Sequence, residues 1–304
     1  MLPPSMHGAA ALRVGVPVLW TWRVVGAMAI TFVVQGVTIG AYAARLAGVQ
    51  ARRIATSISL FNLFMTGGRL ANLFSAVMIG PLSDGAGKAV RVLRDAGDPS
   101  GVAAYQHNFE IQLRFVILAG TAGMVAFALL LPMFTYLFRR GIASFEHRGS
   151  VPHSLARLLD PRVVWEVLRA ERLPGPAALR RFDWRGLPKR MLIFNVLVTG
   201  VYAIGVQASY YASVLDIDAA RTALGLSGII NGIGTIAFTL FVDPTSSMIT
   251  DQAIHGKRSI EEVRSMVFYL SLTAILGTLL SQAIFYPSAW LIEEAARFFN
   301  HVRA

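Results

Sequence analysis

The sequence contains no cysteine and only six histidines, and both features exclude classes of site. Without cysteine there are no disulfides, no thiolate metal ligands and no cysteine nucleophile. The histidines lie in predicted loops or termini and lack the H-E-x-x-H spacing of a zinc helix. Gly232-Ile233-Gly234 lacks the lysine of a phosphate-binding loop and a preceding strand. We therefore expect neither a metal nor any other cofactor.

Charged residues are also scarce, at 15% of the 304 residues, whereas hydrophobic residues reach 55% and occur in runs of twenty or more. A chain of this composition cannot bury its apolar surface in one water-soluble core. The formal charge of +11 lies mainly between the apolar runs, where Lys and Arg set topology and meet anionic phospholipids. Nucleic acid is therefore not an expected partner. The sequence predicts an all-α, multi-pass integral membrane protein.

The apolar runs predict six transmembrane helices, over residues 24–44, 54–80, 115–138, 191–215, 222–249 and 266–287. The first also resembles a signal peptide ending at Ala41-Tyr42-Ala43, but its polar residues recur on one helical face, which favours a retained span. Residues 81–111 are expected to form a polar loop with a turn at Asp98-Pro99, and Pro132 is expected to kink the third span.

Three regions follow from these spans. Residues 1–138 hold a leader and three spans, residues 139–190 form a basic connector with short amphipathic helices on the membrane surface, and residues 191–304 hold three more spans and an interfacial tail. The loops after the odd-numbered spans, with Arg45 assigned to the first of them, carry eighteen Lys and Arg, and the other loops and termini carry nine. The positive-inside rule places the former in the cytoplasm and both termini outside.

The two three-span regions share residues at a shift of 169 positions. Tyr42 aligns with Tyr211, Arg52 with Arg221 and Asn62 with Asn231, each pair at a span end, a turn or a span start. Chance can supply three identities, but their equivalent placement favours a repeat. Because each region has an odd number of spans, the two would be inverted repeats, with a site between them near the membrane midplane.

The second span carries one charge, Arg69, close to the middle of the bilayer. A central Arg costs at least about 3 kcal/mol and often marks a substrate path. On a helix it shares one arc with four polar residues, Ser59, Asn62, Thr66 and Asn72. The alternative is an arginine that snorkels to the headgroups or holds a structural hydrogen bond.

The fifth span has polar residues at every fourth position, namely Ser227, Asn231, Thr235, Thr239 and Asp243, and Asp243 is the only acid within any predicted span. The interspersed Gly225, Gly228, Gly232 and Gly234 are expected to let helices approach closely. A packing interface with Asp243 as an interfacial cap is the alternative. The first span adds a polar face with Gln35 and Tyr42, so we expect a polar cavity between the two repeats.

Several runs resemble one known family. They are Tyr42-Ala43-Ala44-Arg45-Leu46-Ala47-Gly48-Val49, Arg53-Ile54-Ala55, Ser59-Leu60-Phe61-Asn62 with Arg69 and Ala71-Asn72, Leu226-Ser227-Gly228-Ile229-Ile230-Asn231-Gly232, and Phe241-Val242-Asp243-Pro244 with Thr250-Asp251. Together they resemble the Amj family of lipid II flippases, the "alternate to MurJ" proteins of bacterial cell-wall synthesis. The resemblance implies a transporter of the inner membrane, not an enzyme, that moves undecaprenyl-diphosphate-linked peptidoglycan precursor to the outer leaflet.

Under that implication Arg69 is expected to anchor the diphosphate, because a guanidinium binds phosphate oxygens in bidentate fashion. Asn62, Asn72 and Asn231 would bind the headgroup, Asp243 would be a counter-ion or gate, and Ser59, Thr66, Thr235, Gln35 and Tyr42 would complete the site. A membrane-embedded polyprenyl-phosphate enzyme would need a second acid or a histidine near Arg69. A generic exporter or scaffold would not need Arg69. The sequence does not determine whether the protein forms an oligomer.

Overall fold

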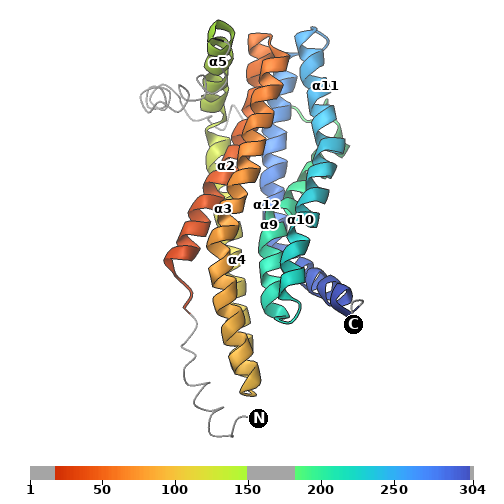
Figure 1. The fold of residues 1–304 in the computed structure, drawn as a ribbon. Coiled ribbons are helices and arrows are strands. Elements are labelled where there is room, and N and C mark those ends of the chain that lie inside the picture. The colour runs from red at the N-terminus through yellow and green to blue at the C-terminus, as the bar shows by residue number, and fades with distance from the viewer. Residues whose placement is uncertain (1–17, 149–181, 302–304) are drawn as a thin grey trace.

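The computed structural model describes residues 18–148 and 182–301, without the side chains of residues 69, 71–73 and 144–148. Within these ranges every regular element is a helix (Figure 1). The N-terminal region begins with α2 (Trp22–Ala51), which reverses at Arg52 into α3 (Ile54–Asp95). Arg52 adopts a left-handed conformation with φ 56°, which ends α2 and allows the sharp reversal. The predicted cleavage motif lies buried inside α2, as expected for a retained span.

The predicted polar loop over residues 81–111 is wrong. Helix α3 continues through Pro81 to Asp95, and α4 (Pro99–Leu129) starts after a short turn. Val90 and Leu93 are buried at helical spacing, so this charged stretch has an apolar face that packs while its charges stay in solvent. The predicted turn at Asp98-Pro99 is confirmed, because Asp98 accepts a hydrogen bond from the Gly101 N–H at 2.9 Å and caps α4.

The predicted kink at Pro132 is confirmed as a break in the helix. Helix α4 ends at Leu129, and α5 (Leu131–Arg148) starts two residues later with Pro132 in its first turn, where its missing N–H costs nothing. The predicted boundary after residue 138 falls inside α5. The amphipathic helices predicted in the connector lie mostly at residues 149–181, outside the described residues.

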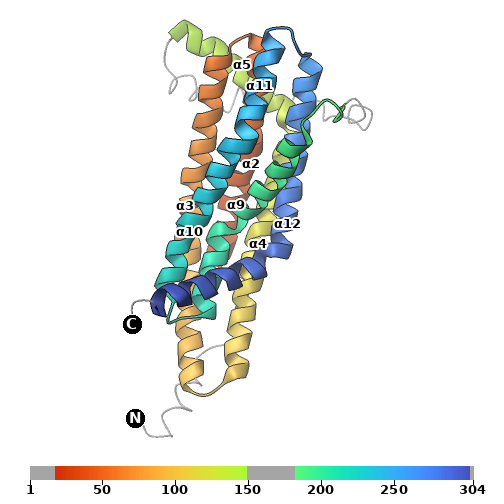
Figure 2. The same cartoon turned by 90° about the vertical axis from the view of Figure 1, so that its right-hand side faces the viewer.

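The C-terminal region contains α9 (Lys189–Leu215), α10 (Ala220–Ala237), the π-helical turn η1 (Phe238–Val242), α11 (Asp243–Ile254) and α12 (Ile260–His301). Helices α10, η1 and α11 follow one another without a loop and together form the predicted fifth span. Helix α12 contains Pro287, and its C-terminal part turns away from the bundle (Figures 1 and 2). The predicted C-terminal tail is therefore the end of this helix.

Five helical segments of the described chain are long and apolar enough to cross a membrane: α2, α4, α9, the continuous segment Ala220–Ile254, and α12. The predicted second span lies on α3, whose apolar part extends over Ile54–Gly68 in the residues described. The prediction of an all-α, multi-pass membrane protein is confirmed. The count of six spans remains a prediction.

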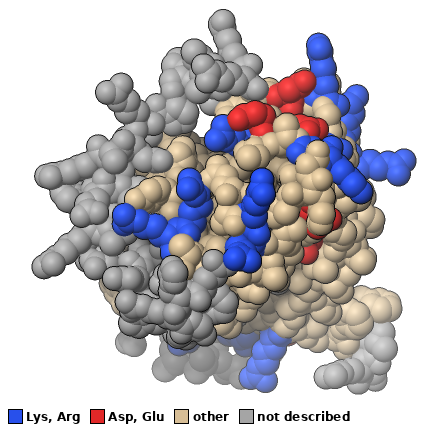
Figure 3. Space-filling model, turned by 90° about the horizontal axis from the view of Figure 1, so that it is seen from above, with Lys and Arg blue, Asp and Glu red and all other residues tan. Residues whose placement is uncertain are grey.

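The turn between α2 and α3, helix α5 and the turn between α11 and α12 lie together at the upper end in Figure 1. These are the segments expected in the cytoplasm from the positive-inside rule. Lys and Arg side chains spread over this end, which we call the upper end (Figure 3). The turns between α3 and α4 and between α9 and α10 lie at the opposite, lower end. The direction in which the protein crosses the membrane remains a prediction.

Glycines allow close helix packing, but mostly not the ones predicted. Gly225, Gly228 and Gly232 on α10 have open space where a Cβ would lie, so the prediction is wrong for these three, whereas Gly234 is buried against Tyr202 of α9. Instead α9 and α12 meet at Gly200 and Gly277, where a Cβ on Gly277 would come within 2.5 Å of the Val196 carbonyl oxygen. Helix α10 therefore has a glycine-rich face that no other described helix covers. Among its described residues only Ala223 and Gly234 are buried.

Candidate functional site

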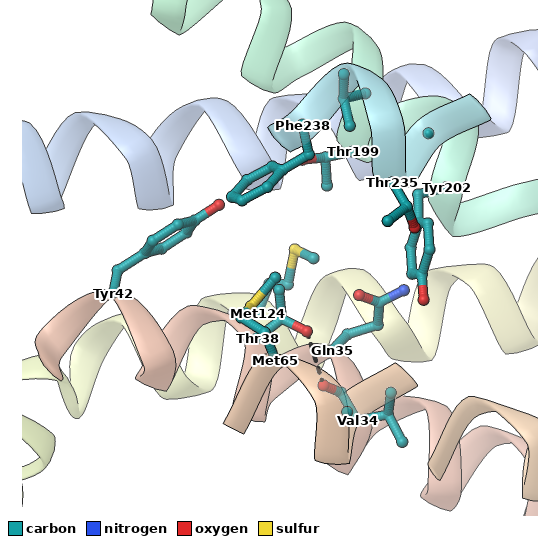
Figure 4. A pocket seen from close by; sticks show the side chains of 13 residues that line it. Val34, Gln35, Thr38, Tyr42, Met65, Met124, Thr199, Tyr202, Thr235 and Phe238 are labelled. Carbon is teal, nitrogen blue, oxygen red and sulfur yellow. Dashed lines mark hydrogen bonds between the residues drawn. The ribbon is translucent and has the colours of Figure 1, made fainter. Parts of the chain in front are cut away.

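A small cavity lies in the middle of the bundle, where helices of the N-terminal and C-terminal regions meet. It is lined from α2, α3, α4, α9, α10 and η1 by Val34, Gln35, Thr38, Tyr42, Met65, Gly68, Met124, Val198, Thr199, Tyr202, Gly234, Thr235 and Phe238. Figure 4 shows side chains from opposite sides pointing into this space. Its volume of about 50 Å³ holds a few water molecules at most. We call it the central cavity.

Three of the predicted site residues line the central cavity: Gln35 and Tyr42 from α2 and Thr235 from α10. Thr38, from the same polar face of α2, also lines the cavity, and its hydroxyl donates a hydrogen bond to the Val34 carbonyl at 3.1 Å. The cavity therefore combines amide and hydroxyl groups with methionine and aromatic walls. It is neither a packed apolar core nor an open aqueous channel.

Tyr42 connects the cavity to the rest of the bundle. Its hydroxyl donates to Asn195 Oδ1 of α9 at 3.1 Å, and the Asn195 amide donates to the Leu270 carbonyl at 2.8 Å and to Thr273 Oγ1 at 2.9 Å on α12. Both Tyr42 and Asn195 are at most 1% exposed. A buried polar network with these partners satisfied holds α2, α9 and α12 in one fixed arrangement.

One helical turn above Tyr42, Arg45 forms the most deeply buried ion pair of the described residues. Its guanidinium is 2% exposed, pairs with Asp243 of α11 and donates to Ser247 Oγ at 2.9 Å. It also lies over the Phe61 ring of α3, 4.2 Å from the centroid. The Arg45 Nε is buried without a hydrogen-bond partner, so the guanidinium has one unused donor.

The sequence analysis missed Arg45, because it assigned this residue to the basic turn after the first span. That assignment is wrong, since α2 continues to Ala51 and Arg45 lies well inside it. Asp243 pairs with Arg45, and its role as a counter-ion or gate in transport stays a prediction. Helical spacing was the available signal, because Arg45 follows Tyr42 by three residues and shares its face.

The predicted polar arc of α3 does not face the central cavity. Ser59, Asn62 and Thr66 are exposed on the outside of the helix, and Met65 and Gly68 line the cavity in their place. Arg69 and Asn72 lie on the same helix, but their side chains are outside the described part. The structure therefore leaves the predicted diphosphate anchor untested.

Asn231 of α10 lies outside the cavity lining, against Gly205 of α9. Its Oδ1 is buried without a hydrogen-bond partner. Such an acceptor in an apolar helix interface is costly, because nothing replaces its hydrogen bond to water.

At the lower end, charged groups form structural ties. Arg114 donates to Glu110 at 2.8 Å and to the Gln282 carbonyl at 2.7 Å, which joins α4 to α12. Two acids of the turn between α9 and α10, Asp216 and Asp218, pair with Arg297 at 2.7 Å and with Arg94 at 2.9 Å. No group of three metal-ligating side chains occurs within the described residues 18–148 and 182–301. These acids therefore hold helix ends together.

The chain matches known proteins along nearly its whole length. A family described as "Alternate to MurJ", Amj, matches residues 30–296, which include every residue that lines the central cavity. The protein named Lipid II flippase Amj from Bacillus subtilis (strain 168) is 34% identical over 260 residues, which cover 85% of this chain and 91% of the relative. No solved structure matches. The chain belongs to the Amj family, the alternates to MurJ.

Proposed function

We propose that this protein is a lipid II flippase of the bacterial inner membrane, a transporter rather than an enzyme. The observation that carries the proposal is the match to the Bacillus subtilis flippase, which extends over 85% of this chain. The family match spans the helices that line the central cavity. The likeness therefore includes the part of the molecule through which a headgroup would pass.

Flipping needs a polar route for the headgroup and a lateral opening for the tail. Lipid II carries a diphosphate and sugars on a long polyprenyl chain, and the chain can stay in the lipid while the headgroup crosses. The central cavity offers amide and hydroxyl groups at its walls, and α3 and α10 expose polar or glycine-rich faces next to it. We infer that the headgroup crosses along the seam between α3 and α10.

The central cavity of about 50 Å³ cannot hold a disaccharide diphosphate, so this conformation is a closed one. Substrate passage requires α10 to move away from α2 and α3. Helix α10 is suited to such a movement because only Ala223 and Gly234 of it are buried among its described residues. Elements with little buried surface separate from a fold at the lowest free-energy cost.

The Arg45–Asp243 pair closes the upper end of this route. It joins α2 to α11, directly beyond Tyr42 of the central cavity. Phosphate oxygens bind the same planar fork as a carboxylate does, so a diphosphate can compete with Asp243 for Arg45. Asp243 would then act as the gate, and arrival of substrate would favour the open state.

Arg69 remains our proposed anchor deeper in the membrane. At 100° per residue, position 69 of α3 lies between the arc of Met65 and Gly68, which line the cavity, and the exposed arc of Asn62 and Thr66. Asn72, Asn231 and the polar residues of α2 and α10 would bind the sugars. Arg45 and Arg69 would then be successive cations along one path.

We also propose that residues 1–138 and 191–304 are inverted repeats joined by the basic connector. Supporting this, the hairpin of α2 and α3 turns at the upper end, whereas the hairpin of α9 and α10 turns at the lower end (Figure 1). Tyr42 and Tyr211 are both buried on the first helix of each hairpin, nine and four residues before its last residue. Inverted hairpins around a midplane site are typical of secondary transporters.

The test is complementation of a bacterial strain depleted of its other lipid II flippases. We expect the chain to restore growth and the amount of precursor accessible at the outer leaflet. The matched control is the empty vector, with the amount of protein in the membrane measured in each culture. Restored growth without precursor at the outer leaflet would favour a scaffold and contradict the proposal.

A further inference from the structure

A second and larger cavity lies at the upper end, on a different side of α2 from the central cavity. It has a volume of about 510 Å³ and is bounded by α2, the break between α4 and α5, and α12. Its lining is Leu46, Gln50, Ala128, Leu129, Leu131, Pro132, Thr135, Tyr136, Arg139, Phe182, Arg264, Val267, Phe268, Ser271, Leu272 and Ile275. No residue is shared with the central cavity. We call it the upper cavity.

The upper cavity exists because the helix breaks at Leu130. Pro132 starts a new helix there, so α5 leaves the line of α4 and opens space against α12. The volume lies within the range of sites for small ligands, about 300–1,000 Å³. An apolar space of this size inside a bilayer fills with hydrocarbon and not with water, because water needs polar partners.

The hydroxyl groups of two residues that line the upper cavity already have hydrogen-bond partners in the protein. The hydroxyls of Thr135 and Ser271 each donate to a carbonyl one turn earlier in their own helix, at 2.9 Å. Phe182 and Phe268 stack with ring centroids 4.4 Å apart and form one side. These groups suit an acyl chain, and they offer little to a disaccharide, whose hydroxyls need several partners.

Two cations belong to the lining of the upper cavity, Arg139 of α5 and Arg264 of α12, and both are exposed. No acidic residue lines it. Arg264 also donates to Glu261 at 2.6 Å, but that carboxylate is 70% exposed, and such surface pairs contribute little. Both arginines lie at the end where Lys and Arg collect (Figure 3). The cavity thus combines an apolar interior with a cationic rim.

We propose that the upper cavity binds one anionic glycerophospholipid, with an acyl chain in the apolar interior and the phosphate at Arg139 and Arg264. Basic pockets between membrane helices bind anionic lipid headgroups in this way. The lipid would bridge α5 of the N-terminal region and α12 of the C-terminal region. This gives a defined place to the contact with anionic phospholipid predicted from charge, and it is independent of the proposed transport.

The test is lipid binding by the purified full chain, measured by native mass spectrometry with phosphatidylglycerol and, separately, with phosphatidylcholine. We expect one phosphatidylglycerol to stay bound to the unaltered protein. The double variant Arg139→Gln/Arg264→Gln is expected to weaken this binding about thirtyfold, because two lost charge–phosphate contacts of about 1 kcal/mol each add up at the membrane surface. The control Arg91→Gln/Arg221→Gln removes two exposed charges elsewhere and is expected to bind like the unaltered protein.

A second variant, Ser271→Phe, fills the upper cavity without changing charge and is expected to lose the bound lipid. Three results would overturn the proposal: equal retention of phosphatidylglycerol by the double variant and its control, equal retention of phosphatidylcholine, or displacement by equimolar undecaprenyl diphosphate. The last would assign the cavity to the substrate instead. Because binding is measured without transport, a failed flippase assay leaves this result unaffected.

Discussion

Arg45 and Asp243 lie 198 residues apart in the sequence and pair in the interior of the bundle, where Arg45 is 2% exposed. The pair joins the N-terminal and C-terminal regions one turn above the central cavity. Asp243 starts α11 directly after the π-helical turn η1, and such turns are frequent at functional sites. A link placed here is broken whenever the two regions separate at the upper end.

We expect Asp243→Asn to open the upper end of the route. Loss of one partner of a fully buried ion pair costs about 3–5 kcal/mol. Because Asp243 is 34% exposed, we expect the closed state to lose only about 1–2 kcal/mol. This corresponds to a roughly tenfold larger population of the open state. Because the chain lacks cysteine, a Thr38→Cys reporter in the central cavity has no background. Its rate of modification by a small thiol reagent, applied to inside-out vesicles, should rise about tenfold.

The matched control is Asp218→Asn with the same reporter. It breaks an ion pair with Arg94 at the lower end, where both side chains are exposed, and should leave the modification rate unchanged. The charge exchange Arg45→Asp/Asp243→Arg restores a pair and should bring the rate back toward that of the unaltered protein. Equal rates for Asp243→Asn and Asp218→Asn would contradict the gate.

Tyr42→Phe should destabilise the protein without opening it. The change removes the hydrogen bond to Asn195 and leaves a buried amide oxygen unpaired, at a cost of about 1–3 kcal/mol. We expect a lower thermal midpoint in detergent and an unaltered Thr38→Cys modification rate. Tyr136→Phe, on an exposed tyrosine of α5, is the control and should not move the midpoint. A thermal midpoint unchanged by Tyr42→Phe would show that this hydrogen-bond network does not stabilise the closed state.

Local features of the sequence predicted much of the fold correctly. The run that forms α9 was placed within two residues of its observed start, because residues 191–215 are a predominantly apolar stretch without a charged residue. The Asp98-Pro99 turn and the break at Pro132 were found because proline and a capping acid act locally. The lower half of α3 was missed because its charges were taken to indicate a loop, although Val90 and Leu93 supply an apolar face.

The candidate site was less predictable, because its main contact is not local. Arg45 is a basic residue near the end of a span, as are many topology signals; its spacing from Tyr42 places it on the same helical face, but its partner on α11 comes from a distant part of the sequence. The polar arc of α3 was identified by periodicity, but periodicity cannot tell a cavity from an outer face. Gln35, Tyr42 and Thr235 line the cavity, whereas Ser59, Asn62 and Thr66 do not.

Glycine substitutions should separate packing positions from open ones. Gly277→Ala places a Cβ 2.5 Å from the Val196 carbonyl oxygen and 3.0 Å from the Gly200 nitrogen, so α9 and α12 must move apart. Overpacking of this kind costs about 1–3 kcal/mol, seen as a lower thermal midpoint. Gly232→Ala on α10 meets open space and should be neutral or slightly stabilising, by up to about 1 kcal/mol. Equal midpoints for the two variants would contradict the α9–α12 contact.

Acid should loosen the C-terminal part of α12. Burial alone would raise the pKa of the Asp216 carboxyl, but hydrogen bonds from Arg297 and from two backbone N–H groups outweigh it and hold the pKa below its ordinary value of 3.8. A carboxyl with a depressed folded pKa stabilises the fold above the unfolded value and loses this contribution as the pH falls through the folded value.

The thermal midpoint should therefore drop between pH 5 and pH 3 by more in the unaltered protein than in Asp216→Asn, which cannot gain that proton. Asp84→Asn removes an exposed carboxyl of α3 and serves as the control, with an unchanged pH profile expected. Identical profiles for Asp216→Asn and the unaltered protein would show that the Arg297 contact carries none of the acid sensitivity.

Arg69 gives the most direct test of the transport route. If it anchors the diphosphate, Arg69→Ala removes a charge-assisted hydrogen bond of about 1.5–3 kcal/mol and should lower the rate of precursor translocation about 10- to 100-fold. Arg69→Lys keeps the charge but loses the bidentate fork, so it should impair translocation while the protein stays in the membrane. Arg91→Ala, on an exposed arginine of the same helix, controls for lost charge. Full translocation by Arg69→Ala would contradict the anchor at this position and leave Arg45, one helical turn beyond Tyr42 of the cavity, as the buried cation of this route.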